Sequence, residues 1–81
     1  MKTIPTKYRV ETAVEMWNGE RVNGHDYGLK DMAMKVYERI RALYKRLGYT
    51  LAYAEDECGG IEECWEKEGY NDRYLRIYPT L

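Results

Sequence analysis

The side chains best suited to chemistry are concentrated between Glu55 and Trp65, in the segment EDECGGIEECW, which holds five carboxylates and two thiols. Such groups could bind a metal ion. A structural zinc site usually pairs its cysteine ligands as C-x-x-C, whereas five residues separate Cys58 from Cys64, and His25 is the single histidine. The acids also lack the alternate spacing of an EF-hand calcium loop. We therefore expect no metal and no cofactor in this segment.

The same two cysteines could instead form a redox pair. A reactive thiol needs a pKa lowered by a nearby cation or a helix N-terminus, but carboxylates crowd both Cys58 and Cys64 and raise the pKa of a thiol. Cys64 is better explained as a small buried residue beside Trp65. A disulfide would require the two cysteines to lie on facing backbone, and a reducing cytoplasm would keep both as thiols. We favour the structural role.

His25 and Asp26 are the only place where a general base and a carboxylate adjoin, and glycines flank the pair. Adjacent residues rarely orient each other as a catalytic dyad does, and the chain contains no serine that could act as nucleophile. We therefore predict that the protein is not an enzyme. A small enzyme or a metal-binding protein built around His25, Cys58 and Cys64 is retained as an alternative.

Charge is segregated along the chain, although the net charge is only −1. Residues 30–46 carry six basic side chains against two acidic ones, and residues 55–68 carry seven acidic side chains against one basic. The acidic run could anchor a basic partner, because aromatic residues supply buried contacts and charge steers association. The predicted partner-binding residues, which we call the acidic patch, are Glu55, Asp56, Glu57, Glu62, Glu63, Trp65 and Glu66.

The basic run offers a second binding surface. Its cations are interleaved with Tyr37 and Tyr44, a combination that suits phosphate contact and base stacking. Both tyrosines, however, lie on or beside the apolar stripe of the helix predicted below, and the acidic run would repel phosphate at short range. Nucleic-acid binding is therefore our second choice. The residues that would carry it are Lys35, Arg39, Arg41, Lys45 and Arg46.

Hydrophobic periodicity predicts the elements that position these residues. In residues 8–17, mostly apolar side chains alternate with mostly charged ones at every second position, which predicts a strand with one buried face. Asn18-Gly19 predicts a tight hairpin turn into a short strand at residues 20–22, and residues 23–28 are expected to form a loop. Residues 49–54 and 74–78 again have extended character.

Residues 29–47 carry apolar side chains at three- and four-residue spacing, which predicts a long amphipathic helix that ends at Gly48. Residues 61–68 fit either a helix or a strand. A strand would place Glu63 and Lys67 on the apolar side, and β-branched residues are lacking after the first position. We therefore favour a short second helix there.

Together these elements predict one α+β domain over residues 1–81: a small antiparallel sheet of three to four strands, packed by the helix at about 29–47, with a short second helix at about 61–68. The N-terminal residues lack the apolar run of a secretory signal. No segment approaches the roughly 18 apolar residues that a membrane helix needs. We expect a cytoplasmic protein that does not enter a membrane.

These observations favour a non-enzymatic protein-binding module, because binding requires only a stable platform and a patterned surface. The expected partner is another protein, such as a basic protein that handles nucleic acids. A homodimer could form if the basic helix of one copy faced the acidic segment of the other. In size and lack of catalytic machinery the chain resembles in style the small inhibitors and accessory proteins carried by phages and other mobile elements, anti-CRISPR proteins among them. No sequence motif carries this resemblance.

Overall fold

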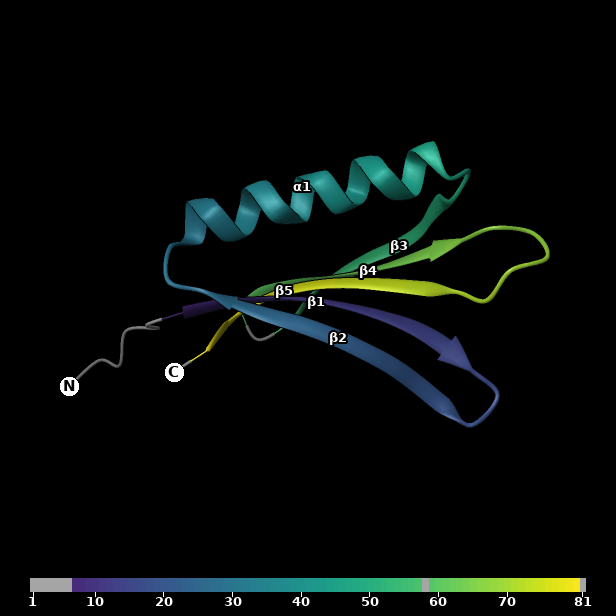
Figure 1. Cartoon of the computed structure of the whole chain (residues 1–81), viewed down its shortest axis with the longest axis horizontal. Coiled ribbons are helices and arrows are strands. Elements are labelled where there is room, and N and C mark those ends of the chain that lie inside the picture. Colours follow the sequence, from purple (N-terminus) through teal and green to yellow (C-terminus); the bar gives the residue numbers. More distant parts are fainter. Residues whose placement is uncertain (1–6, 58, 81) are drawn as a thin grey trace.

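The computed structural model describes residues 7–57 and 59–80, which form one five-stranded antiparallel sheet and one α-helix. The elements are β1 (Lys7–Met16), β2 (Gly19–Tyr27), α1 (Lys30–Arg46), β3 (Thr50–Glu57), β4 (Gly60–Glu66) and β5 (Arg73–Thr80). Figure 1 shows α1 lying across one face of the sheet. The strand order is β2-β1-β5-β4-β3, so the last strand of the chain lies at the centre of the sheet.

β1 and β2 form a hairpin one residue earlier than the predicted Asn18-Gly19 turn, because the loop residues are Trp17 and Asn18 and Gly19 already belongs to β2. Met16 pairs with Gly19 across a two-residue loop, and Gly19 has a φ of +124°, which glycine adopts without strain. The predicted loop at residues 23–28 is wrong, because β2 continues as far as Tyr27 and pairs with β1 along its whole length. Pairing with a long neighbouring strand overrides the weak strand propensity of the Asn-Gly dipeptide.

The predicted second helix at residues 61–68 is also wrong, and the predicted sheet of three to four strands is too small. Residues Gly60–Glu66 form β4, which pairs with β3 on one side and with β5 on the other. An isolated helix of this length is marginal in water. A strand between two others satisfies its backbone groups on both edges. Tertiary pairing therefore decides the structure of this segment.

α1 lies within the predicted range of 29–47 and buries one stripe of side chains against the sheet. Asp31 lies in its first turn, and Lys45 and Arg46 lie in its last turn. Each charge has the sign that the helix dipole stabilises at that end. Gly48 follows with a φ of +92°. The core comprises Val10, Ala33, Tyr37, Tyr44, Tyr49, Trp65, Leu75 and Ile77. No helix in the described residues is long and apolar enough to span a membrane.

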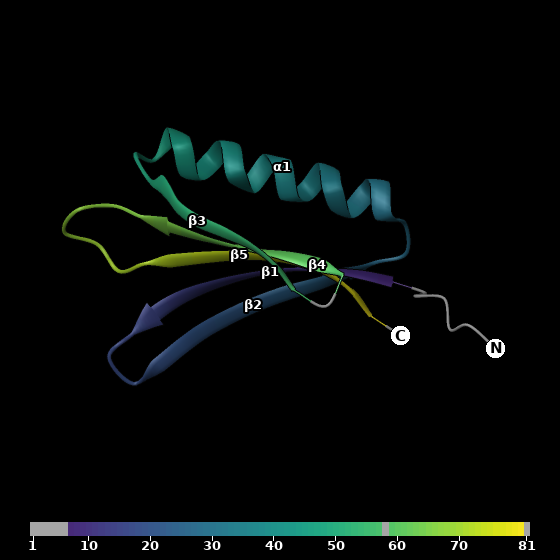
Figure 2. The same cartoon turned by 180° about the vertical axis from the view of Figure 1, so that it is seen from behind.

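The sheet has two different faces, because successive residues of a strand point in opposite directions. One face packs against α1, chiefly through β1 and β5. The other face, which we call the open face, is not covered by any element of the described chain, as both views show (Figures 1 and 2). A sheet covered on one side only is a two-layer α+β fold, and its open face is available for contact with a partner.

Candidate functional site

Among the residues whose side chains the structure describes, the open face carries seven acidic residues against three basic ones. Strand register assigns each side chain to this face. Its charged residues are Glu11, Glu15, Glu20, Asp26, Glu55, Glu62 and Glu66, with Lys7, Arg9 and Arg76. Its uncharged residues include Ala13, Val22, Tyr53, Cys64, Tyr74 and Tyr78. The face is therefore acidic and rich in tyrosine.

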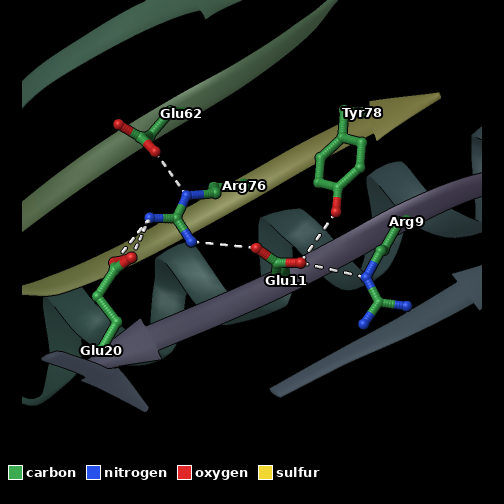
Figure 3. A network of polar contacts seen from close by, with 6 residues as sticks. All are labelled: Arg9, Glu11, Glu20, Glu62, Arg76 and Tyr78. Atoms are coloured by element: carbon green, nitrogen blue, oxygen red, sulfur yellow. Dashed lines mark hydrogen bonds and ion pairs between the residues drawn. The ribbon is translucent and has the colours of Figure 1, made fainter. Parts of the chain in front are cut away.

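Arg76 lies at the centre of this face and joins three strands (Figure 3). Its Nε donates a hydrogen bond to Glu62 in β4, its Nη1 donates to Glu11 in β1 at 3.0 Å, and its Nη2 donates to Glu20 in β2 at 2.8 Å. Burial lowers the pKa of the guanidinium, but the bonds to the carboxylates outweigh burial, so the pKa of Arg76 is raised. One cation thus holds together carboxylates that would otherwise repel each other.

Glu11 is the most heavily hydrogen-bonded carboxylate of the open face. It accepts bonds from the Tyr78 hydroxyl at 2.9 Å, from Arg9 Nε at 3.2 Å and from Arg76 (Figure 3). Burial raises the pKa of Glu11, but the bonds from Tyr78, Arg9 and Arg76 outweigh it, so the pKa lies below its usual value of 4.5. Glu11 is therefore held as an ion, and both of its carboxylate oxygens accept hydrogen bonds from within the protein.

Three other carboxylates of the open face remain accessible. Glu15, Glu55 and Glu66 are exposed and make no ion pair within the described part of the chain. Between them the row of β-strand partners Tyr74, Cys64 and Tyr53 crosses the sheet. A cationic side chain can contact an accessible carboxylate and a neighbouring tyrosine ring at the same time.

The thiol of Cys64 lies in this row but is buried. Burial raises its pKa, and the nearby carboxylates of Asp72 and Glu66 raise it further. Burial likewise raises the pKa of the Tyr74 hydroxyl to about 12. Both groups are therefore protonated at neutral pH, and Cys64 has the environment of an unreactive thiol. The other cysteine of the proposed redox pair, Cys58, lies outside the described residues.

The predicted acidic patch does not form one surface, because β3 and β4 are strands and their residues alternate between faces. Glu55, Glu62 and Glu66 lie on the open face. Asp56 pairs with Ile61 and lies on the helix side, where Glu63 and Trp65 are buried. The backbone of Glu57 ends β3, and its side chain lies outside the described structure. A helix over residues 61–68 would have kept more of these acids together.

Glu63 and Trp65 instead form a polar cluster in the core, beneath α1. The Trp65 indole N–H donates to Glu63 Oε1 at 3.1 Å, and Arg41 Nε lies 3.2 Å from Glu63 Oε2. The Tyr37 hydroxyl is buried nearby; burial raises its pKa, and the charge of Glu63 raises it further. This cluster stabilises the helix on the sheet and is closed to partners.

The predicted nucleic-acid residues lie on α1, on the opposite side of the molecule from the open face. Lys35, Arg39, Lys45 and Arg46 are exposed, whereas Arg41 turns towards Glu63. The tyrosines that could have stacked on bases, Tyr37 and Tyr44, are buried in the core. The protein is thus a slab with a basic helix on one side and an acidic sheet face on the other.

The other candidates for chemistry are separated by the fold. His25 and Asp26 are consecutive in β2, so their side chains project to opposite faces; the ring of His25 lies 4.7 Å from that of Tyr27, and Asp26 pairs with Arg9 at 3.2 Å. In residues 7–57 and 59–80, no three histidine, cysteine or acidic side chains are arranged to hold a metal ion. His25 and Asp26 are thus not arranged as a dyad.

Comparisons with protein-family models, with curated proteins and with solved structures gave no significant match. The candidate site therefore depends on the geometry of this chain. Sequence reasoning missed Glu11, Glu20 and Arg76, which come together from three strands. The signal that could have identified Arg76 was its position inside an otherwise apolar strand, LRIY, where a charge requires a partner on a neighbouring strand.

Proposed function

We propose that the protein is a binding module whose open face takes a positively charged surface of another protein. The observation that carries this proposal is the excess of carboxylates on a sheet face that no element of the described chain covers. Exposed Glu15, Glu55 and Glu66 would steer and contact the partner, while the tyrosines supply apolar area. Arg76 and its carboxylates would keep the platform rigid.

The partner class follows from charge. A surface that neutralises several carboxylates is rich in lysine and arginine, and such surfaces are typical of proteins that handle nucleic acids. By occupying that surface the module would exclude DNA or RNA from it. This is the mode of action expected of a cytoplasmic inhibitor or accessory protein of the phage-borne kind, and it requires no catalysis and no cofactor.

A closed homodimer that pairs helix with acidic face does not fit this geometry. The basic side of α1 and the open face point in opposite directions, so a contact between them is heterologous. Such a contact leaves one free face of each kind on a pair of subunits, so it continues into a ring or an open chain of subunits. The proposal therefore concerns a different protein as partner.

The test is capture of nucleic-acid-handling proteins from a host lysate on the immobilised protein. Reversal of charge in Glu15→Lys, Glu55→Lys and Glu66→Lys together should abolish capture, and these positions lie outside the Arg76 network, so the fold is retained. The matched control reverses Lys35, Arg39 and Arg46 to glutamate and should capture normally. Free DNA should compete with the module for the captured protein. Equal capture by the triple open-face variant would disprove the proposal.

Direct nucleic-acid binding through α1 is the second candidate, and the exposed cations of that helix favour it. Phosphate contact without base stacking would give salt-dependent binding with little sequence preference. In a gel-shift assay with random duplex DNA, the Lys35, Arg39 and Arg46 reversal variant would then lose binding, and the open-face variant would bind more tightly. If the unmodified protein does not bind duplex DNA even at low salt, nucleic-acid binding through α1 is wrong.

A further inference from the structure

A hollow at one end of the sheet combines exposed aromatic rings with carboxylates. It lies between the β1–β2 turn and the loop that joins β4 to β5, has a volume of about 430 Å³, and opens to solvent. Figure 1 shows that these two connections lie at the same end of the sheet. The lining residues are Glu15, Met16, Trp17, Tyr70, Asn71 and Asp72.

The two aromatic residues of the hollow are unusually accessible. Trp17 is 94% exposed at the hairpin turn, and Tyr70 is 61% exposed in the facing loop. The protein's other tryptophan, Trp65, is only 1% exposed. Tryptophan and tyrosine are the residues that most often become energetic hot spots when a partner covers them. Their exposure on both sides of one hollow therefore indicates a contact site.

The hollow is electrostatically suited to a cation. Glu15 and Asp72 supply its charges, and neither lysine nor arginine is among its lining residues. Tyr70 already has one cation near its ring, since Lys67 Nζ lies 4.5 Å from the ring centroid, so an incoming cation would use the other face of Tyr70 or the ring of Trp17. A cation near an aromatic face and a carboxylate gains from both contacts.

The walls of the hollow are held in place by backbone contacts. The backbone N–H of Glu15 donates to the carbonyl oxygen of Asp72 at 3.0 Å, which ties the end of β1 to the β4–β5 loop. Within that loop the N–H of Tyr70 donates to the carbonyl oxygen of Lys67 at 3.0 Å. The ring of Tyr70 also lies edge-on to that of Tyr49, with centroids 6.4 Å apart. A site whose groups are already positioned loses less entropy on binding.

We propose that this hollow binds an arginine side chain of the basic partner. Arginine is favoured over lysine because its planar guanidinium stacks on aromatic rings and donates in parallel to a carboxylate. Glu15 belongs to the open face as well, so a partner lying on that face would place an arginine at its end. The inference rests on the proposed function for the identity of the partner, but the hollow can be tested by itself.

The test uses N-acetyl-arginine amide, with N-acetyl-citrulline amide as the uncharged analogue of the same shape. In a two-dimensional proton–nitrogen spectrum of the whole chain, the two indole N–H groups report separately. The indole N–H signal of Trp17 should shift when the arginine compound is added at millimolar concentration and should not shift with the citrulline compound. Trp65, whose indole N–H is bound to Glu63 at 3.1 Å in the core, should stay fixed and so confirms an intact fold.

Variants then assign the binding groups. Glu15→Gln with Asp72→Asn should weaken binding of the arginine compound about fivefold or more, and Tyr70→Ala should weaken it comparably. Glu68→Gln, which removes a nearby carboxylate outside the lining, should bind as the unmodified protein does. Equal shifts of Trp17 with arginine and citrulline, or no shift with either, would overturn the arginine site. If arginine does not bind but partner capture is normal, the open-face proposal remains and the arginine site is wrong. If capture fails but the Trp17 signal shifts with arginine, the arginine site remains and the open-face proposal is wrong.

Discussion

Glu63 in β4 lies 3.2 Å from Arg41 in α1, across the interface between sheet and helix. Only 6% of the Glu63 side chain is exposed, and its second oxygen accepts the indole N–H of Trp65. The carboxylate is therefore removed from water but keeps a cation and a donor. This arrangement allows a glutamate to occupy the apolar side of a central strand.

Arg41→Met should lower the free energy of unfolding by about 3–5 kcal/mol, because it leaves the Glu63 charge buried without its cation. Adding Glu63→Gln should restore most of the loss, since glutamine removes the charge and can still accept the bond from Trp65. Urea denaturation of the single and double variants measures the coupling. Arg39→Met, on the exposed side of the same helix, is the control and should change stability by less than about 0.5 kcal/mol. Additive effects of the two substitutions would mean that the ion pair is not coupled.

The same pair explains where the sequence prediction failed. The sequence disfavours a strand over residues 61–68 because a strand places Glu63 on the apolar side, and the structure does bury Glu63 there. Its cation comes from Arg41, which is 22 positions earlier and belongs to another element. The sequence of residues 61–68 alone contains no information on that contact, and its residue propensities favour a helix.

The long helix and the β1–β2 turn could be predicted because their signals are local: an apolar stripe, end charges and an Asn-Gly pair. The open face could not. Its acids come from β1, β2, β3 and β4, and only the strand order brings Glu11, Glu20 and Glu62 around Arg76. The segregation of charge was visible in the sequence, but alternation along β4 decides which acids of the run reach the surface.

Stability should fall in acid partly through Glu11. Its pKa is lower in the folded protein than its usual value of 4.5, so its contribution is complete above that value and is lost as pH falls through the folded pKa. The stability difference between the unmodified protein and Glu11→Gln should therefore shrink as pH is lowered from 6 through 4.5 and below. Thermal or urea unfolding at each pH measures it. Glu66→Gln, exposed on the same face, is the control. A difference that stays constant over this range would contradict the role of Glu11.

Gly60→Ala should destabilise the protein by about 1–3 kcal/mol, because an added methyl group would overlap the backbone oxygen of Ile77 and lie 2.6 Å from the Cβ of Tyr78. Both atoms belong to the central strand β5 and cannot move freely. Gly28→Ala is the matched control: a Cβ there meets no atom within 4 Å, and the backbone conformation is ordinary. It should change stability by no more than about 0.5 kcal/mol, in the stabilising direction. Urea midpoints separate the two, and equal effects would show that β4 and β5 are not packed as closely as the structure places them.

Cys64 should react slowly with thiol reagents in the folded protein, because it is only 3% exposed and its pKa is raised by burial and by Asp72 and Glu66. A Cys58→Ser background makes the reaction report on Cys64 alone. Labelling should then require opening of the sheet, so its rate should rise steeply as urea approaches the unfolding midpoint. Arg41→Met in the same background should label faster, in proportion to its loss of stability, whereas Arg39→Met should not. Rapid labelling in the absence of urea would instead place Cys64 at an accessible position on the open face.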